Sequence, residues 1–130
     1  MEDQNNLTGE EEALLEDLLG GLGLYMKLPF AQMGAANAMS GCGPAFMSMV
    51  LEALGDGGVK HGLTRTQAYT LAACGMEGTA KLQLETGLHP GVLKDQVCSP
   101  GGVTIRGVAA LEENGLRNAL LKAIDATFEK

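Results

Sequence analysis

The chain has 130 residues, which is one domain's worth and enough to bury a hydrophobic core. Its formal net charge of −7, its scattered Lys and Arg residues and its lack of Trp argue against nucleic acid as the main partner. No apolar run is long enough to cross a membrane, and the acidic start MEDQNNLTGEEE is unlike a secretory signal. We therefore expect a cytoplasmic globular protein with neither a membrane nor a nucleic-acid partner.

The segment LTGEEEALLEDLLGG (residues 7–21) predicts the first helix. Thr8 can cap it, Glu11 three residues later completes a capping-box pattern, and a Gly-Gly pair ends it. LGLYMKLP (residues 22–29) follows, with weak alternation suited to a short strand. A helix followed by a short strand is typical of the last unit of an α/β layer, yet no partner strand is visible elsewhere. This pattern indicates that something upstream is missing.

From residue 28 onward only helices are predicted. FAQMGAANAM (residues 30–39) is a short helix, SGCGP breaks it, and Pro44 suits the first turn of the next helix. The stretch from Ala45 is apolar nearly all round, which is typical of a helix buried on several sides, often inside an oligomer. Three of its residues are Gly55, Gly57 and Gly58. Each glycine costs about 1 kcal/mol of helix propensity relative to Ala, so we expect another helix to cross very close there.

The segment LTRTQAYTLAACGMEGTAKLQLETG (residues 63–87) predicts a long helix. Thr64 caps it with Gln67 three residues on, and Gly87 is a natural stop. Its small residues are Ala72, Ala73, Gly75 and Gly78. They again indicate close contact with another helix. Pro90 then starts a short helix, and two more helices follow, the last of them amphipathic.

The three cysteines are odd in number and widely spaced: Cys42, Cys74 and Cys98. No Cys-x-x-Cys pair is present, and His61 and His89 stand at no metal-ligand spacing from them. This pattern favours buried or half-buried reduced thiols and no metal site. A catalytic cysteine paired with a histidine is an alternative that has no local signature.

The stretch QVCSPGGVTIRG (residues 96–107) predicts an anion pocket built from the backbone. Consecutive glycines let neighbouring N–H groups converge on one point, and the helix that follows adds unpaired N–H groups and the positive end of its dipole. The donors would come from Gly101, Gly102, Val103 and Thr104. Residues 99–104 of this stretch contain no Lys or Arg, which favours a small carboxylate over a triphosphate. An equally weighted alternative is that Ser99 or Thr104 caps the helix and the glycines form a tight turn.

No dinucleotide-binding fingerprint is present. GGLGLYM lacks the third glycine and a preceding strand, and GCGPAF has proline where the G-x-G-x-x-G motif needs a helix that continues from a strand. The chain therefore carries no ordinary nucleotide-binding domain.

Two blocks of the sequence resemble one enzyme family. HPGVLKDQVCSPGGVTIRGVAALEENGLRNAL (residues 89–120) closely resembles the signature region of pyrroline-5-carboxylate reductases. AMSGCGPAFMSMVLEALGDGGVKHGL (residues 38–63) resembles the same family's Ser-Gly-Ser-Gly-Pro-Ala-Tyr segment and the long helix after it. The order and spacing of both blocks match, and the resemblance extends from Thr8 onward. Cys42 stands where Ser is usual in this family, and Phe46 stands where Tyr is usual.

This resemblance implies the architecture. Members of the family have an N-terminal Rossmann domain for NAD(P)H and an all-helical C-terminal domain that interlocks with its twin. Residues 29–130 are therefore expected to form an all-α, interlocked dimerisation domain of the 6-phosphogluconate-dehydrogenase C-terminal-like type. Residues 1–28 match only the last helix and strand of the Rossmann domain. We expect the chain to be a C-terminal portion that forms a homodimer, with decamers as a further level of assembly.

The resemblance also implies the chemistry. In this family a hydride passes from NADPH or NADH to the C=N carbon of Δ1-pyrroline-5-carboxylate, which gives L-proline. The implied substrate-binding residues are Val97, Ser99, Gly101, Gly102, Val103 and Thr104. The hydroxyl of Thr104 is implied to point toward the ring nitrogen as the catalytic group, and Gly43 and Pro44 are expected near the nicotinamide.

The cofactor would be bound mainly by the missing Rossmann domain, so the chain alone is expected to be inactive. A second hypothesis is a non-catalytic helical homo-oligomer that binds a ligand or a partner.

Overall fold

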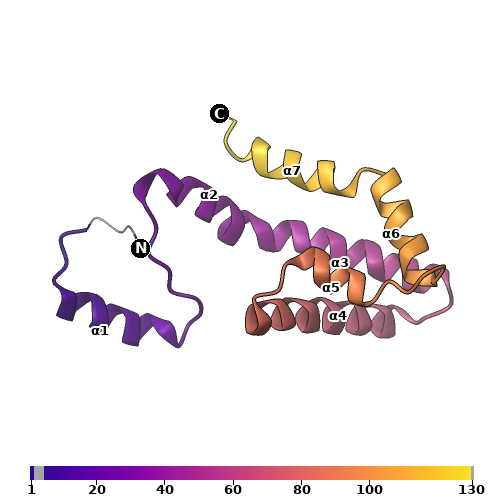
Figure 1. The fold of residues 1–130 in the computed structure, drawn as a ribbon, viewed down its shortest axis with the longest axis horizontal. Helices are drawn as coiled ribbons and strands as arrows, with labels where there is room; N and C mark the ends of the chain where they lie inside the picture. The colour runs from indigo at the N-terminus through magenta and orange to yellow at the C-terminus, as the bar shows by residue number, and fades with distance from the viewer. Residues whose placement is uncertain (2–4, 130) are drawn as a thin grey trace. The chain divides into compact units, whose positions relative to one another are not determined.

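The structure is a computed structural model that describes residues 1 and 5–129 (Figure 1). The chain divides into two compact units, Met1–Cys42 and Gly43–Lys130. Within the described residues every regular element is a helix, and Leu28 forms an isolated bridge. The all-α class expected from the sequence is confirmed, and the domain division between residues 28 and 29 stays a prediction.

In the first unit, α1 (Gly9–Gly20) begins with the predicted capping box. The amide of Glu11 donates to the Thr8 hydroxyl at 3.3 Å, and the amide of Thr8 donates to the Glu11 carboxylate at 2.8 Å. These two bonds satisfy donors that a helix start otherwise leaves unpaired.

The expected strand after α1 is not formed in the described part of the chain. The segment is extended, and its partner is the first residue of the chain. The Met1 ammonium donates to the Met26 carbonyl at 2.8 Å, and the Leu28 amide donates to the Met1 carbonyl at 2.9 Å. Among the described residues, these two bonds to Met1 do not make a sheet.

The chain then stays helical where the sequence predicts a break. The elements are η1 (Phe30–Gln32), α2 (Met33–Asn37), the π-helical turn η2 (Ala38–Cys42) and α3 (Gly43–Lys60). The predicted interruption at SGCGP is therefore wrong. Pro44 has no N–H to donate and its ring crowds the carbonyl four residues back, and a widened π turn directly before it accommodates both.

In the second unit, α3 and α4 (Arg65–Thr86) lie side by side (Figure 1). A Cβ at Gly58 would lie 2.9 Å from the Ala68 Cβ, and one at Gly55 would overlap the ring of Tyr69. The close crossing predicted for these two glycines is confirmed. Gly57 instead has open space around its Cα, as do Gly75 and Gly78 in α4.

Helix α4 has the ends that its sequence predicts. Its capping box joins Thr64 to Gln67, and Gly87 adopts the left-handed conformation with φ +64°. The unit is completed by α5 (Pro90–Gln96), α6 (Val103–Glu113) and α7 (Leu116–Ala126).

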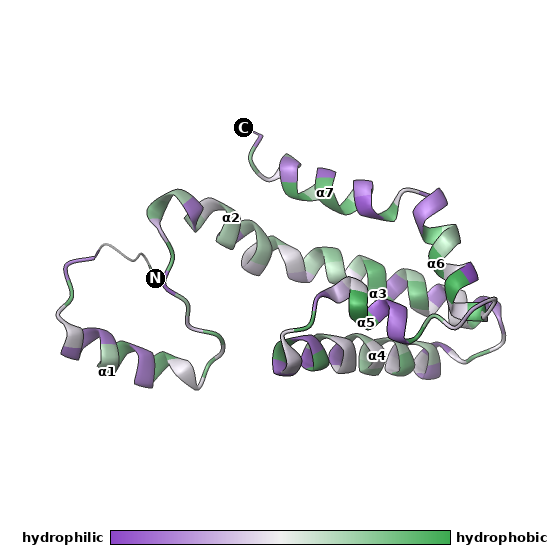
Figure 2. Cartoon of the chain, viewed as in Figure 1, coloured by the Kyte–Doolittle hydropathy of each residue, from purple (hydrophilic) through white to green (hydrophobic). Residues whose placement is uncertain are grey.

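Few side chains of the second unit are buried. Among its described residues, Gly55, Ala68 and Leu93 are buried. Helix α3 is mostly hydrophobic along its length (Figure 2). Large apolar side chains stay exposed on five helices, as Met49, Leu71, Val92, Val103 and Leu121 illustrate. One copy of this unit therefore leaves apolar faces uncovered, as expected of an oligomer subunit.

No helix in the described residues combines the length and the hydropathy needed to span a bilayer. The cysteines are free thiols in the described part: Cys42 and Cys98 are half-buried as expected, whereas Cys74 is exposed.

Candidate functional site

The predicted anion loop joins α5 to α6. Helix α5 is anchored by Leu93, which is 7% exposed, and it starts with Pro90 at its first position as expected. The helix is capped by a residue that the sequence analysis did not assign: the Gly91 amide donates to His89 Nδ1 at 3.0 Å. Histidine is not a usual cap residue, so only the Pro-Gly pair after it signals this role.

The loop itself contains a tight turn. The Gly102 amide donates to the Ser99 carbonyl at 3.0 Å, and Gly101 has φ +68°. Proline at the second position and a left-handed glycine at the third are typical of a type II turn. The Gly102 amide is thus used inside the loop and is not among the donors available to an anion.

The turn leads directly into a helix whose first residues have no side-chain cap. Gly102 is the N-cap of α6, and no side chain caps this helix, so the proposed capping roles of Ser99 and Thr104 are wrong. The first amides of a helix lack partners within it, and the dipole adds partial positive charge there. Gly101 and Thr104 are exposed, and Val103 is 75% exposed. The loop therefore presents backbone donors toward solvent.

The Thr104 hydroxyl makes no hydrogen bond with any described residue. Thr79 and Thr86, in the second half of α4, donate to the carbonyl four residues back at 2.8 and 2.7 Å. Thr104 is the second residue of α6, and the carbonyl four residues earlier is that of Pro100 in the turn. Its hydroxyl therefore stays free to donate to or accept from a ligand.

Two cations near the loop are paired, whereas Arg106 in the first turn of α6 makes no ion pair or hydrogen bond with any described residue. The Lys94 ammonium contacts the Asp95 carboxylate, and this hydrogen bond raises the pKa of Lys94. Arg117, at the start of α7, donates to Glu112 at 2.6 Å. Residues 99–104 themselves contain no cation, so anion binding within the loop would rest on backbone dipoles.

The predicted nicotinamide contacts lie elsewhere in the same unit. Gly43 and Pro44 open α3, whereas the loop that leads into α6 lies at the other end of that helix (Figure 1). Helix α3 has 18 residues, which correspond to about 27 Å. One copy of the chain therefore does not bring the two groups of predicted site residues together.

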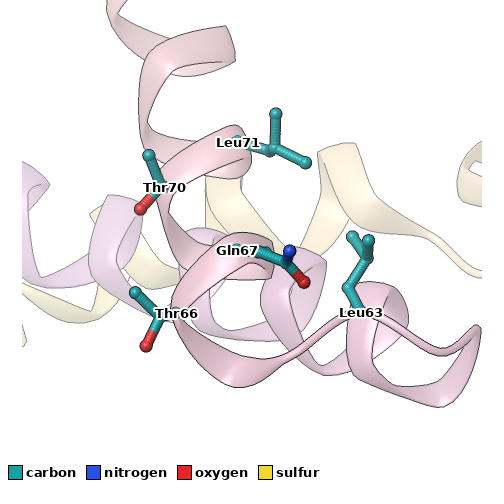
Figure 3. A pocket seen from close by; sticks show the side chains of 5 residues that line it. All are labelled: Leu63, Thr66, Gln67, Thr70 and Leu71. Atoms are coloured by element: carbon teal, nitrogen blue, oxygen red, sulfur yellow. The ribbon is translucent and has the colours of Figure 1, made fainter.

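A hollow of about 340 Å³ lies at the start of α4 (Figure 3). Its lining residues are Leu63, Thr66, Gln67, Thr70 and Leu71. All five are exposed, so the hollow is open to solvent, unlike the enclosed clefts that bury most of a small ligand. It contains none of the predicted site residues. Within the described residues, no group of three or more His, Cys, Asp or Glu residues could hold a metal ion.

Comparison with known proteins identifies the relatives of this fold. A family model described as pyrroline-5-carboxylate reductase dimerisation matches residues 31–130. The chain belongs to the pyrroline-5-carboxylate reductase family. Among curated proteins, it is 47% identical over 127 residues to the pyrroline-5-carboxylate reductase of Treponema pallidum and 43% identical over 125 residues to that of Methanosarcina acetivorans.

Solved reductase structures agree with this assignment. The pyrroline-5-carboxylate reductase of Coxiella burnetii matches with a TM-score of 0.89 and 30% identity, covering 97% of this chain and 47% of that one. The Plasmodium falciparum enzyme, solved with NADP bound, matches with a TM-score of 0.85 and 30% identity, covering 95% and 50%. The matches to the two curated relatives span 98% and 96% of this chain. They span only 48% and 46% of the relatives' own length. The chain thus spans about half the length of the curated relatives it matches.

Proposed function

We propose that this chain supplies the dimer interface and the substrate-carboxylate pocket of a pyrroline-5-carboxylate reductase. Such an enzyme reduces Δ1-pyrroline-5-carboxylate to L-proline with NADPH or NADH. The observation that carries the proposal is the uncapped start of α6 behind the Ser99–Gly102 turn, in a chain of this family.

The roles within the loop follow from its geometry. The exposed amides of Gly101, Val103 and Thr104 receive the carboxylate, with the helix dipole behind them. The Thr104 hydroxyl meets the ring nitrogen, which takes up a proton as the C=N bond is reduced. Ser99 holds the turn through its carbonyl, and Val97 lines the approach with its 64%-exposed side chain. A carboxylate fits this site better than a triphosphate, because residues 99–104 contain no Lys or Arg.

The nicotinamide supplies the hydride, and a Rossmann domain outside these 130 residues binds most of the dinucleotide. The chain's own contribution would be Gly43 and Pro44. A Cβ at Gly43 would meet nothing within 4 Å, so a flat ring can approach the backbone there. Because this site and the loop lie at opposite ends of α3, we propose that a second copy brings the loop of one protomer to the α3 start of the other.

The assembly is a homodimer, and dimers associate further into decamers. Its driving force is the apolar surface that one copy leaves exposed, including Met49, Leu71 and Leu121. We place the protein in the cytoplasm, where free thiols such as Cys42, Cys74 and Cys98 persist.

The test is a titration of the pure 130-residue chain with L-proline, followed by NMR. The expected result is a set of shifts in the amides of Gly101, Val103 and Thr104 that weakens on Thr104→Ala. Thr79→Ala in α4, remote from the loop, is the matched control and should leave the shifts intact. Light scattering at micromolar concentration should give a dimer or a larger assembly and not a monomer, and the chain alone should not turn over NAD(P)H. A dimer that shows no shifts at high millimolar proline would favour the assembly module instead.

A further inference from the structure

The segment before the loop begins with an unusual helix cap. His89 has extended backbone with φ −59° and ψ 133°, and its Nδ1 accepts the Gly91 amide at 3.0 Å. Ser, Thr, Asp and Asn are the side chains that usually cap helices. Pro90, at the first helical position, has no N–H, so the Gly91 amide is the first in α5 that needs a partner.

The imidazole of His89 lies close to the backbone of Gly91. A Cβ at position 91 would lie 3.0 Å from His89 Nδ1 and 3.3 Å from its Cε1. These separations are tighter than ordinary van der Waals contact, so a side chain at position 91 would require the ring to shift by a few tenths of an ångström, which should strain its hydrogen bond to the amide. His89 and Gly91 therefore form one unit around Pro90.

Helix α5 links this unit to the proposed carboxylate loop. Helix α5 has only seven residues, too few to be stable without external support. At its other end the Val97 amide donates to the Lys94 carbonyl at 3.2 Å, and the Cys98 amide donates to the Asp95 carbonyl at 3.1 Å. The turn that closes on the Ser99 carbonyl comes next. The position of the loop thus depends on whether α5 keeps its first turn.

We infer that His89 is a positioning residue for the substrate loop. Its imidazole carries the proton on Nε2, so Nδ1 can accept the Gly91 amide and cap α5. The helix in turn determines the position of Val97, where the loop begins. This inference rests on the proposed function, in which the loop holds the substrate carboxylate. His89 itself lies one helix before the loop and is not assigned any contact with the substrate.

The test uses the full 130-residue chain at pH 7.5 and two readouts. A scalar coupling across the hydrogen bond between the Gly91 amide nitrogen and His89 Nδ1 reports the cap directly. L-Proline titration followed at the amides of Gly101 and Thr104 reports the loop. His89→Ala should weaken proline binding by about fivefold, the factor that one lost cap is worth. His89→Asn restores an acceptor at the cap position and should bind within about twofold of the original chain.

A double-mutant comparison adds a control for general damage. Gly91→Ala alone should weaken proline binding about as much as His89→Ala. In the His89→Ala background the ring is gone, so Gly91→Ala should add little further loss. Full additivity of the two changes would overturn the inference, as would equal weakening by His89→Ala and His89→Asn.

The remaining outcomes separate the two claims. If proline shifts are present but His89→Ala binds like the original chain, or if the coupling is absent, the inference is overturned and the proposed function stands. If the Gly91–His89 coupling is present but proline produces no amide shifts in the loop, the proposed function is wrong. The role of His89 in substrate binding is then wrong as well.

Discussion

Tyr69 lies against the backbone of Gly55 where α3 and α4 cross, so closely that a Cβ at position 55 would overlap its Cε1 and Cδ1. The same tyrosine lies under the guanidinium of Arg65, 5.4 Å from its ring centroid, and Arg65 also pairs with Asp56 of α3. Asp56 is therefore a paired group. The aromatic ring fills the space that the missing side chain leaves, which joins the two helices.

Gly55→Ala is expected to destabilise the second unit. Overpacking a close contact costs about 1–3 kcal/mol, which exceeds the roughly 1 kcal/mol that Ala gains over Gly in a helix. Gly57→Ala is the matched control, because a Cβ there would meet nothing within 4 Å in the chain. Urea denaturation should show a lower midpoint for Gly55→Ala only. An unchanged or higher midpoint for that variant would show that Tyr69 can move away without cost.

The N-cap of α4 is expected to contribute to the stability of the fold. The Gln67 amide donates to the Thr64 hydroxyl at 3.3 Å, and the Thr64 amide donates to the Gln67 side chain at 3.0 Å. Thr64→Ala removes the first bond and should lower the free energy of unfolding by about 1 kcal/mol, whereas Thr64→Ser should keep it. Thr70→Ala, on the exposed side of the same helix, serves as the control. Equal stability of the Ala and Ser variants would refute a capping role.

Signals between residues close in sequence predicted much of the fold. Both capping boxes, Thr8 with Glu11 and Thr64 with Gln67, depend on residues three apart and form as expected. Gly87 is left-handed for the same local reason. The π turn was missed because the letters SGCGP encode a helix break equally well, and only the observed backbone shows that the helix widens instead.

Features that depend on neighbours distant in sequence were predicted only in part. Small residues indicate close helix contact, yet Gly55 and Gly58 meet α4 while Gly75 and Gly78 face open space in the single chain. In the candidate loop, the glycines predicted convergent amides, but one of those amides, that of Gly102, closes the turn onto Ser99. Whether a given N–H is free depends on backbone torsion angles that residue types alone do not determine.

Acidification is expected to weaken α1. The amide and hydroxyl of Thr8 hold the pKa of Glu11 below its ordinary value near 4.5, and Lys27, followed by Asn5, does the same for Glu12. A carboxylate whose pKa is lower in the folded chain stabilises the fold above its unfolded pKa, and this contribution is lost as pH falls through the folded pKa.

Circular dichroism from pH 7 to pH 3 measures this loss of helix. Glu11→Gln keeps a side chain that suits the capping box but does not titrate, so its helical signal should fall less on acidification. Because Lys27 is exposed and Glu12 is only half-buried, added salt should reduce the contribution of the Glu12–Lys27 pair. Identical pH profiles for the original chain and Glu11→Gln would contradict the role of this box.

The turn before α6 is expected to control ligand binding. A Cβ at Gly102 would lie 3.0 Å from the Ser99 carbonyl oxygen and would overlap the Ser99 hydroxyl. Gly102→Ala therefore requires the Ser99 hydroxyl to rotate and the turn to widen by a few tenths of an ångström. Widening the turn shifts the first amides of α6 relative to the carboxylate, and L-proline affinity should fall by NMR titration, as expected when charge-assisted hydrogen bonds are disturbed. Gly107→Ala, inside α6 with open space around it, is the control and should bind normally. Normal proline binding by Gly102→Ala would mean that the ligand is held elsewhere.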